Sequence, residues 1–235
     1  MELEFHRLPG LTPYQVAWDL QRAAHADVAA GRREPVVYLL EHEPVFTAGR
    51  RTEPHEYPFD GSEVIPVDRG GKITWHGPGQ LVAYPIIALP DPIDVVAYLR
   101  RLEDAAITVC AAFGLRGYRV PSRSGVWLSN NPLVPDTSRG EVRGKDDDGV
   151  ATSGNFTESK VCAVGARVAQ SVTMHGMALN CDPDLTPFTQ FIPCGITDAG
   201  VTSLSRAASR DITVANALPI LQQALADSLS PLLGD

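Results

Sequence analysis

The sequence lacks both a long hydrophobic run and a paired-cysteine motif. Its apolar stretches are interrupted well before the ~20 residues that a membrane-spanning helix needs. The four cysteines, Cys110, Cys162, Cys181 and Cys194, have no CxxC spacing, so nothing indicates a secreted disulfide framework. The first residues contain no basic stretch followed by an apolar core, so no secretory signal is visible. We therefore expect a cytoplasmic protein with reduced thiols and no membrane contact.

Positive charge is also scarce, because 20 Lys and Arg residues stand against 28 Asp and Glu residues. The resulting net charge of −8 argues against a general nucleic-acid binder. A phosphate-binding loop is excluded because Lys72 is followed by Ile73 rather than by Ser or Thr. The Gly-x-Ser-x-Gly signature of serine hydrolases is missing. His76, His175 and the cysteines show no recognisable zinc-ligand spacing, so we expect no metal.

The patterning that is present predicts both helices and strands. Apolar periodicity and end signals predict helices over residues 13–30, 91–113, 202–209 and 214–229, the second capped by Asp91. Short apolar runs predict strands over residues 2–8, 35–41, 63–68, 81–87, 119–128, 160–168 and 171–180. This mixture predicts an α/β fold, a mixed sheet with flanking helices, in a single domain spanning 1–235. A polar segment at about 129–157 is expected to be a flexible surface insertion.

The stretch from residue 69 to residue 80 is the most unusual part of the chain, because its glycines gather around His76. Clustered glycines indicate either tight turns or a ligand that lies against bare main chain. Arg69, Lys72 and Thr74, which stand between the turns, favour a binding site. His175 is also followed by glycine, although each of these histidines alone is more often a hydrogen-bonded structural residue.

Cys194 is the cysteine best suited to chemistry. It stands between Pro193 and Gly195, outside any periodic segment, whereas Cys110 and Cys162 fit a helix and a strand as small buried side chains. A thiol nucleophile needs exposure and a nearby cation that favours the thiolate. Lys160 is a candidate for that cation, although the sequence alone favours a solvated lysine at this position.

Several motifs together resemble one family, the lipoyl(octanoyl) transferases. They are Arg-Gly-Gly-Lys-Ile-Thr-Trp-His-Gly-Pro-Gly-Gln at 69–80, Lys-Val-Cys-Ala-Val-Gly at 160–165, His-Gly-Met-Ala-Leu-Asn at 175–180, Pro-Cys-Gly-Ile at 193–196, and a further segment at 42–50. The order also matches, and the similarity runs from about Tyr14 to Leu204. The chain departs from the family in the longer connection near 129–157.

The resemblance implies a fold like the catalytic domains of biotin and lipoate protein ligases. It also implies transfer of an octanoyl group from octanoyl-acyl carrier protein to a specific lysine of lipoyl domains, in lipoic acid biosynthesis. The implied acceptors are the lipoyl domains of 2-oxoacid dehydrogenase complexes and the carrier protein of the glycine cleavage system. No metal, nucleotide or other cofactor is required for this reaction.

The resemblance further assigns roles to individual residues. Cys194 is implied to carry the acyl group as a thioester, and Lys160 to activate it. The acyl site is implied to be lined by Arg69, Gly70, Gly71, Lys72, Ile73, Thr74, Trp75, His76, Ala163, Val164, Gly165, Gly176, Met177 and Ala178. Two alternatives remain. An ATP-dependent lipoate or biotin-type ligase would not need the Cys194 thiol, and a non-catalytic acyl-binding module would hold a fatty acid without a covalent adduct.

Overall fold

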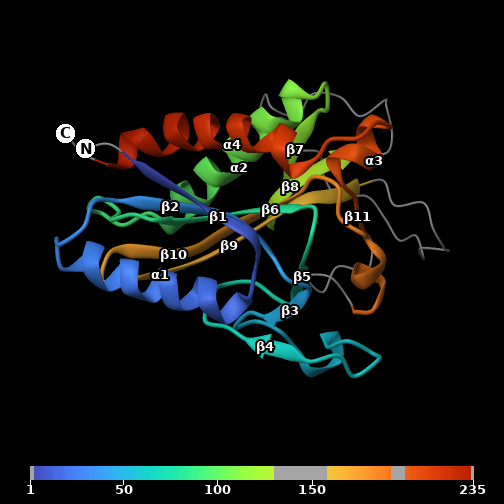
Figure 1. Cartoon of the computed structure of the whole chain (residues 1–235), viewed down its shortest axis with the longest axis horizontal. Helices are drawn as coiled ribbons and strands as arrows, with labels where there is room; N and C mark the ends of the chain where they lie inside the picture. The colour runs from blue at the N-terminus through green and yellow to red at the C-terminus, as the bar shows by residue number, and fades with distance from the viewer. Residues whose placement is uncertain (1–2, 130–157, 192–198, 234–235) are drawn as a thin grey trace.

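The computed structural model describes residues 3–129, 158–191 and 199–233, and its main feature is an eight-stranded mixed sheet (Figure 1). The strands lie in the order β1-β2-β6-β10-β9-β8-β7, and β11 pairs with β9. Their bounds are β1 Glu4–Thr12, β2 Val36–His42, β6 Gln80–Ile86, β7 Gly117–Val120, β8 Arg123–Ser129, β9 Glu158–Ala169, β10 Val172–Asn180 and β11 Gly200–Val201. A second sheet has the order β4-β3-β5, formed by Val64–Pro66, Val45–Ala48 and Thr74–His76.

Helices cover both faces of the large sheet (Figure 1). Helix α1, Tyr14–Ala29, packs on one face, and α2, Val95–Ala112, and α4, Val214–Leu229, pack on the other. The short helix α3, Leu204–Ala208, precedes α4. This arrangement confirms the predicted α/β fold with a mixed sheet and flanking helices.

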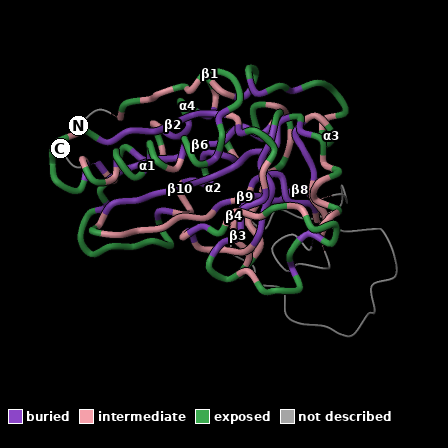
Figure 2. The backbone as a smooth tube through the Cα atoms, turned by 60° about the horizontal axis from the view of Figure 1, so that its bottom comes forward, coloured by how far each residue is buried: buried purple, intermediate pink, exposed green. Residues whose placement is uncertain are grey.

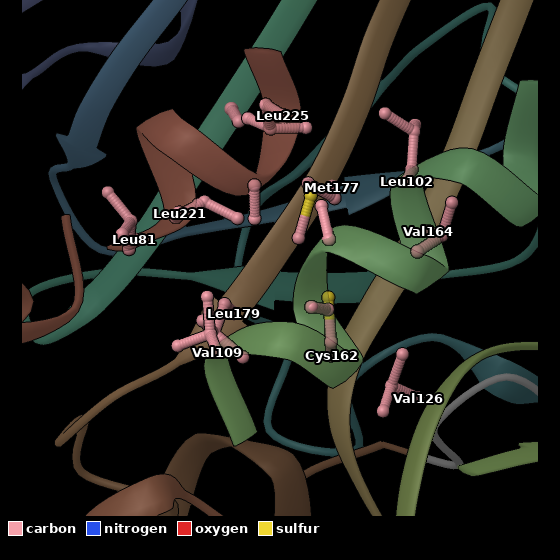
Figure 3. Close-up of a cluster of buried hydrophobic side chains, with 14 of the residues drawn as sticks. Leu81, Leu102, Val109, Val126, Cys162, Val164, Met177, Leu179, Leu221 and Leu225 are labelled. Carbon is pink, nitrogen blue, oxygen red and sulfur yellow. The ribbon is translucent and has the colours of Figure 1, made fainter. Parts of the chain in front are cut away.

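The larger core lies between the sheet and the pair α2 and α4. Leu102 and Val109 of α2 and Leu221 and Leu225 of α4 contact side chains of β9 and β10 there (Figure 3). Because helices cover both faces, every residue of β6 and β10 is buried, and their backbones form purple bands through the molecule (Figure 2). A strand covered on both sides reads as a nearly continuous apolar run, which is why the sequence revealed β6 so clearly.

The structure corrects two details of the predicted elements. Helix α2 begins at Val95 rather than near Asp91, because the Asp94 side chain accepts a hydrogen bond from Ala97 N at 2.8 Å and caps the helix. Strands β3 and β5 were not predicted, since runs of three or four residues are too short to show a period. Among the described helices, none combines the length and apolarity that crossing a bilayer requires.

The expected insertion falls largely on residues 130–157, which lie outside the described residues. The strands on either side of it, β8 and β9, are antiparallel neighbours in the sheet. Ser129 at the end of β8 stands directly opposite Glu158 at the start of β9. The segment therefore joins the two ends of a β-hairpin.

Candidate active site

A cavity of about 520 Å³, including its open mouth, lies between the middle of the large sheet and the segment 69–76. It is lined by Tyr14, Arg69, Gly71, Lys72, Thr74, His76, Tyr84, Ser124, Lys160, Ala163, Val164, Gly165, His175, Gly176, Met177 and Ala178. The structure thus brings together most of the residues singled out from the sequence. Of the predicted site residues that the structure describes, Gly70, Ile73 and Trp75 do not line the cavity.

The floor of the cavity carries almost no side chain. Ala163 of β9 pairs with Ala178 of β10, and Gly165 pairs with Gly176. Alternate residues of a strand share one face of the sheet, so these two pairs lie on the same face. The intervening Val164 belongs to the core on the α2 and α4 side. The cavity floor is therefore main chain and methyl groups, against which a narrow apolar chain can lie closely.

Arg69 builds the wall opposite this floor. Its guanidinium donates to Thr47 O and Thr47 Oγ1, both at 2.9 Å, and to Lys72 O at 2.7 Å. Gly70 N donates to Ala166 O at 3.0 Å, which attaches the loop to β9. Arg69 is buried, so losing these bonds would leave a charge without compensation. Arg69 therefore shapes the loop as well as lining the cavity.

Lys72 is also engaged in a structural contact, since its ammonium forms an ion pair with the fully buried carboxylate of Glu56. The other carboxylate oxygen of Glu56 accepts from Glu53 N at 2.8 Å. Ile73 and Trp75 point to the opposite side of this segment from Thr74 and His76, because β5 alternates. They pack in a cluster of aromatic and aliphatic side chains that includes Phe46 and Phe191.

Lys160 lies at an irregularity in the sheet. The pairing of β8 with β9 shifts here, since Val126 stands opposite Cys162 while the next residue, Trp127, stands opposite Lys160. Bulges of this kind re-aim a side chain and are common beside active sites. Lys160 Nζ lies 4.6 Å from the centroid of the Trp127 ring, and Lys160 is only 9% exposed. At this distance the ammonium is attracted to the aromatic face of Trp127.

Cys194 falls within residues 192–198 and lies outside the described residues. Its described flanks are fixed at both ends. Phe191 is buried in the aromatic cluster beside β5, and Gly200 and Val201 pair with Ser159 and Lys160 of β9. The described chain therefore ends beside β5 before this segment and resumes beside Lys160 after it.

The three described cysteines are poor candidates for a nucleophile. Burial raises the pKa of Cys110 and Cys181 to about 12, and it raises the pKa of Cys162 well above its ordinary value. All three are buried side chains without a disulfide. These three thiols are therefore unsuited to thiolate chemistry.

Burial disfavours the protonated form of three histidines at or near the cavity. Desolvation lowers the pKa of His42 and of His175 to about 4 and lowers that of His76 well below its usual value. His175 Nε2 donates to Asp68 Oδ1 at 2.8 Å. His42 Nδ1 donates to Thr12 O at 2.9 Å, so its Nε2 accepts from the Tyr84 hydroxyl at 2.8 Å.

Sequence reasoning missed Tyr14, Tyr84, Ser124 and the Trp127 ring behind Lys160. The only available signal was an aromatic side chain with a polar atom inside an otherwise apolar strand, as at Tyr84. His175 was noted for its glycine neighbour, and it lies in the cavity wall with a φ of 60°, which is rare for a residue with a side chain. Within the described part of the chain, no group of three or more His, Cys, Asp or Glu residues is arranged to hold a metal ion.

The fold is shared with solved ligases. A bi-partite lipoate protein ligase from Thermoplasma acidophilum superposes with a TM-score of 0.60 at 12% identity, covering 97% of this chain and 83% of that one. The biotin protein ligase from Aquifex aeolicus gives a TM-score of 0.50 at 10% identity, covering 98% and 72%. At such low identity these likenesses establish the architecture alone.

Sequence relatives are far closer. A protein from Salinispora tropica named octanoyltransferase is 51% identical over 94% of this chain and 94% of its own length. One of the same name from Streptomyces coelicolor is 50% identical over 92% of this chain and 88% of its own. Residues 13–226 match the family described as Lipoyl protein ligase A/B catalytic domain. The chain therefore belongs to the lipoyl protein ligase A/B catalytic domain family and, within it, to the octanoyltransferases, which makes it an acyltransferase.

Proposed function

We propose that this chain, acting as a single acyltransferase domain, moves an octanoyl group from acyl carrier protein to a lysine of a lipoyl domain through a thioester on Cys194. The observation that carries the proposal is the position of Lys160. Its ammonium lies against Trp127 at the side of a cavity with a bare floor, and β11, which begins six residues after Cys194, pairs with β9 at Lys160. Such a cation favours a thiolate, which is the reactive form of cysteine.

The cavity suits a straight acyl chain. The pairs Ala163–Ala178 and Gly165–Gly176 leave a lane along β9 and β10 that is free of bulky side chains, and the Gly70 carbonyl closes it above Gly165. A branched or ring-bearing acid would need more width over this lane. The lane begins near Lys160, so the acyl carbonyl lies near the ammonium when the alkyl tail extends along β9.

Lys160 moves one proton in each half of the reaction. The Cys194 thiolate attacks the donor thioester, a new C–S bond forms, and the bond to the carrier's sulfur breaks. The carrier thiolate takes a proton from the Lys160 ammonium, which becomes a neutral amine. The acceptor lysine, as a neutral amine, then attacks the acyl-Cys194 carbonyl, and the C–S bond to Cys194 breaks. The amine passes its surplus proton to Lys160, which restores the thiolate and ammonium pair.

The relatives support this donor and acceptor. The similar proteins of half-identical sequence are named octanoyltransferases. The Thermoplasma ligase was solved as part of a lipoylation system with its E2 lipoyl domain. A shared fold for proteins that act on lipoyl domains is the reason to propose lipoyl-domain acceptors here, those of 2-oxoacid dehydrogenase complexes and of the glycine cleavage system. An acyl carrier protein supplies the acyl group already activated as a thioester, so this route needs no nucleotide.

Intact mass spectrometry tests the proposal. Mixing the protein with octanoyl-acyl carrier protein should add one octanoyl group, which hydroxylamine removes and lipoyl domain discharges. Cys194→Ala should form no adduct and should lose transfer. Transfer at the parental rate by Cys194→Ala would refute the thioester route. Activity with free octanoate that appears only on adding ATP would identify a ligase, and octanoate bound without an adduct would identify a binding module.

A further inference from the structure

An unbroken chain of hydrogen bonds joins His76 in the cavity wall to the main chain of Lys160. His76 Nδ1 lies 2.7 Å from Gln80 Oε1, and Gln80 Nε2 donates to Asn180 Oδ1 at 2.9 Å. Asn180 Nδ2 donates to Thr202 O at 3.0 Å, and Thr202 N donates to Lys160 O at 3.0 Å. Gln80 and Asn180 are 2% and 4% exposed, so these bonds form away from water.

The chain of bonds can run in only one direction. Thr202 O is a main-chain carbonyl and only accepts, so the nitrogen of Asn180 donates to it and the Asn180 oxygen is left to accept. Gln80 Nε2 donates to that oxygen and also to the carbonyl of Trp75 at 3.3 Å, so the Gln80 oxygen accepts in turn. His76 therefore carries its hydrogen on Nδ1. With the hydrogen on Nδ1, a neutral ring leaves a lone pair on Nε2, and burial favours that neutral form by lowering the pKa of His76.

We propose that Gln80 and Asn180 are positioning residues for acyl transfer, a role that rests on the function proposed above. Gln80 holds His76 as an acceptor in the cavity wall, and Asn180 holds the main chain of Lys160 through Thr202. Lys160 Nζ, which accepts the proton, and His76 Nε2, which accepts a hydrogen bond, are thereby held in a fixed position relative to each other during the second half-reaction. As the lysine amine attacks the thioester, Lys160 Nζ takes its surplus proton, and His76 Nε2 accepts a hydrogen bond from the remaining N–H. His76 gains no proton, and the sulfur leaves as the thiolate.

The two links predict different signatures. In Gln80→Met the Nδ1 hydrogen of His76 loses its acceptor, so the ring should populate both neutral tautomers. Transfer from acyl-Cys194 to the lipoyl domain should slow by roughly tenfold to a hundredfold, while loading of Cys194 stays within about twofold. In Asn180→Asp, Gln80 still has an acceptor, so His76 should keep its tautomer. The lost bond to Thr202 should instead slow loading and transfer together, because both use Lys160.

The measurements are two-bond 15N–1H correlation spectra, with the His76 signal assigned by its loss in His76→Gln, and single-turnover rates of each half-reaction. Thr173→Val is the matched control, since Thr173 Oγ1 donates to Pro85 O at 2.7 Å and is fully buried on the same β10, outside the cavity lining. That variant should lose similar stability and keep both rates. A single Nδ1–H tautomer with parental rates in Gln80→Met would overturn the proposal, as would equal slowing in Thr173→Val. Failure of the parental protein to form any adduct would instead refute the proposed function, since the tautomer is measured without substrate.

Discussion

The contact between Gly165 and Gly70 sets the width of the cavity, and Gly165→Ala should disturb it. A Cβ on Gly165 would lie 2.9 Å from Gly70 O and 3.7 Å from Arg69 Cδ. Since ordinary contacts begin near 3.4 Å, the loop and β9 must separate by roughly half an ångström. The loop resists this movement because Gly70 N donates to Ala166 O and the Arg69 guanidinium is held by several acceptors.

The expected cost has two parts. Overpacking a well-fitted contact lowers the free energy of unfolding by about 1–3 kcal/mol. The methyl would also push the loop of Arg69 and Gly71, which lines the cavity, away from β9. A change of one methylene in an apolar pocket alters kcat/KM by roughly 10- to 200-fold. Gly165→Ala should therefore load octanoyl thioester more slowly by about that factor and lose much less with butyryl thioester.

Gly70→Ala is the matched control, because it places a methyl on the other side of the same contact. Its Cβ would lie 3.4 Å from Ala166 O, an ordinary contact, and Gly70 does not line the cavity. Its stability should stay within about 1 kcal/mol of the parent. The assays are urea unfolding and single-turnover loading with butyryl, hexanoyl and octanoyl thioesters. Parental stability in Gly165→Ala, together with an unchanged ranking of the three thioesters by loading rate, would refute this account of the cavity. Equal losses of stability and loading rate in Gly165→Ala and Gly70→Ala would show that the 2.9 Å contact is not the cause.

Three further predictions follow from other parts of the structure. Removing the cation in Lys160→Ala should raise the thiol pKa of Cys194 by roughly one to three units and so slow its alkylation by iodoacetamide near neutral pH. Lys160→Arg should preserve alkylation better than acyl transfer. An unchanged pH profile of alkylation in Lys160→Ala would place the lysine outside the site. Replacing the segment between Ser129 and Glu158 by a short Gly/Ser turn should preserve folding and most turnover, because these two residues already pair across adjacent antiparallel strands. Loss of the cooperative melting transition in this variant would contradict the prediction. Burial lowers the pKa of His42 to about 4, from near 6.5 in the unfolded chain. Between about pH 6.5 and about pH 4 the unfolded chain therefore binds more protons than the folded one, and the free energy of unfolding decreases as the pH falls through this range. That loss is roughly 3 kcal/mol at most, and urea unfolding against pH should show a shallower slope in His42→Gln.

The sequence alone determined the elements with strong periodicity and the identity of the family. Strands β2, β6, β9 and β10 and helices α1, α2 and α4 were predicted because long or fully covered elements need apolar side chains at regular positions. The motifs around His76, Lys160 and Cys194 sufficed to identify the family because several of them occur in the same order along the chain.

Tertiary structure decided which of those residues meet and what each one does. The cross-strand register, which no local pattern records, placed Ala163 opposite Ala178 and Gly165 opposite Gly176 and so made the bare floor. The bulge that brings Lys160 to the Trp127 ring depends on pairing between two strands separated by the long connection 130–157. The sequence suggested Arg69 and Lys72 as binding cations, but their loop and ion-pair contacts arise from Thr47 and Glu56, which lie far away in the chain. A buried polar side chain must form hydrogen bonds, and its partners are the groups that the fold places within reach, so they cannot be predicted from the local sequence.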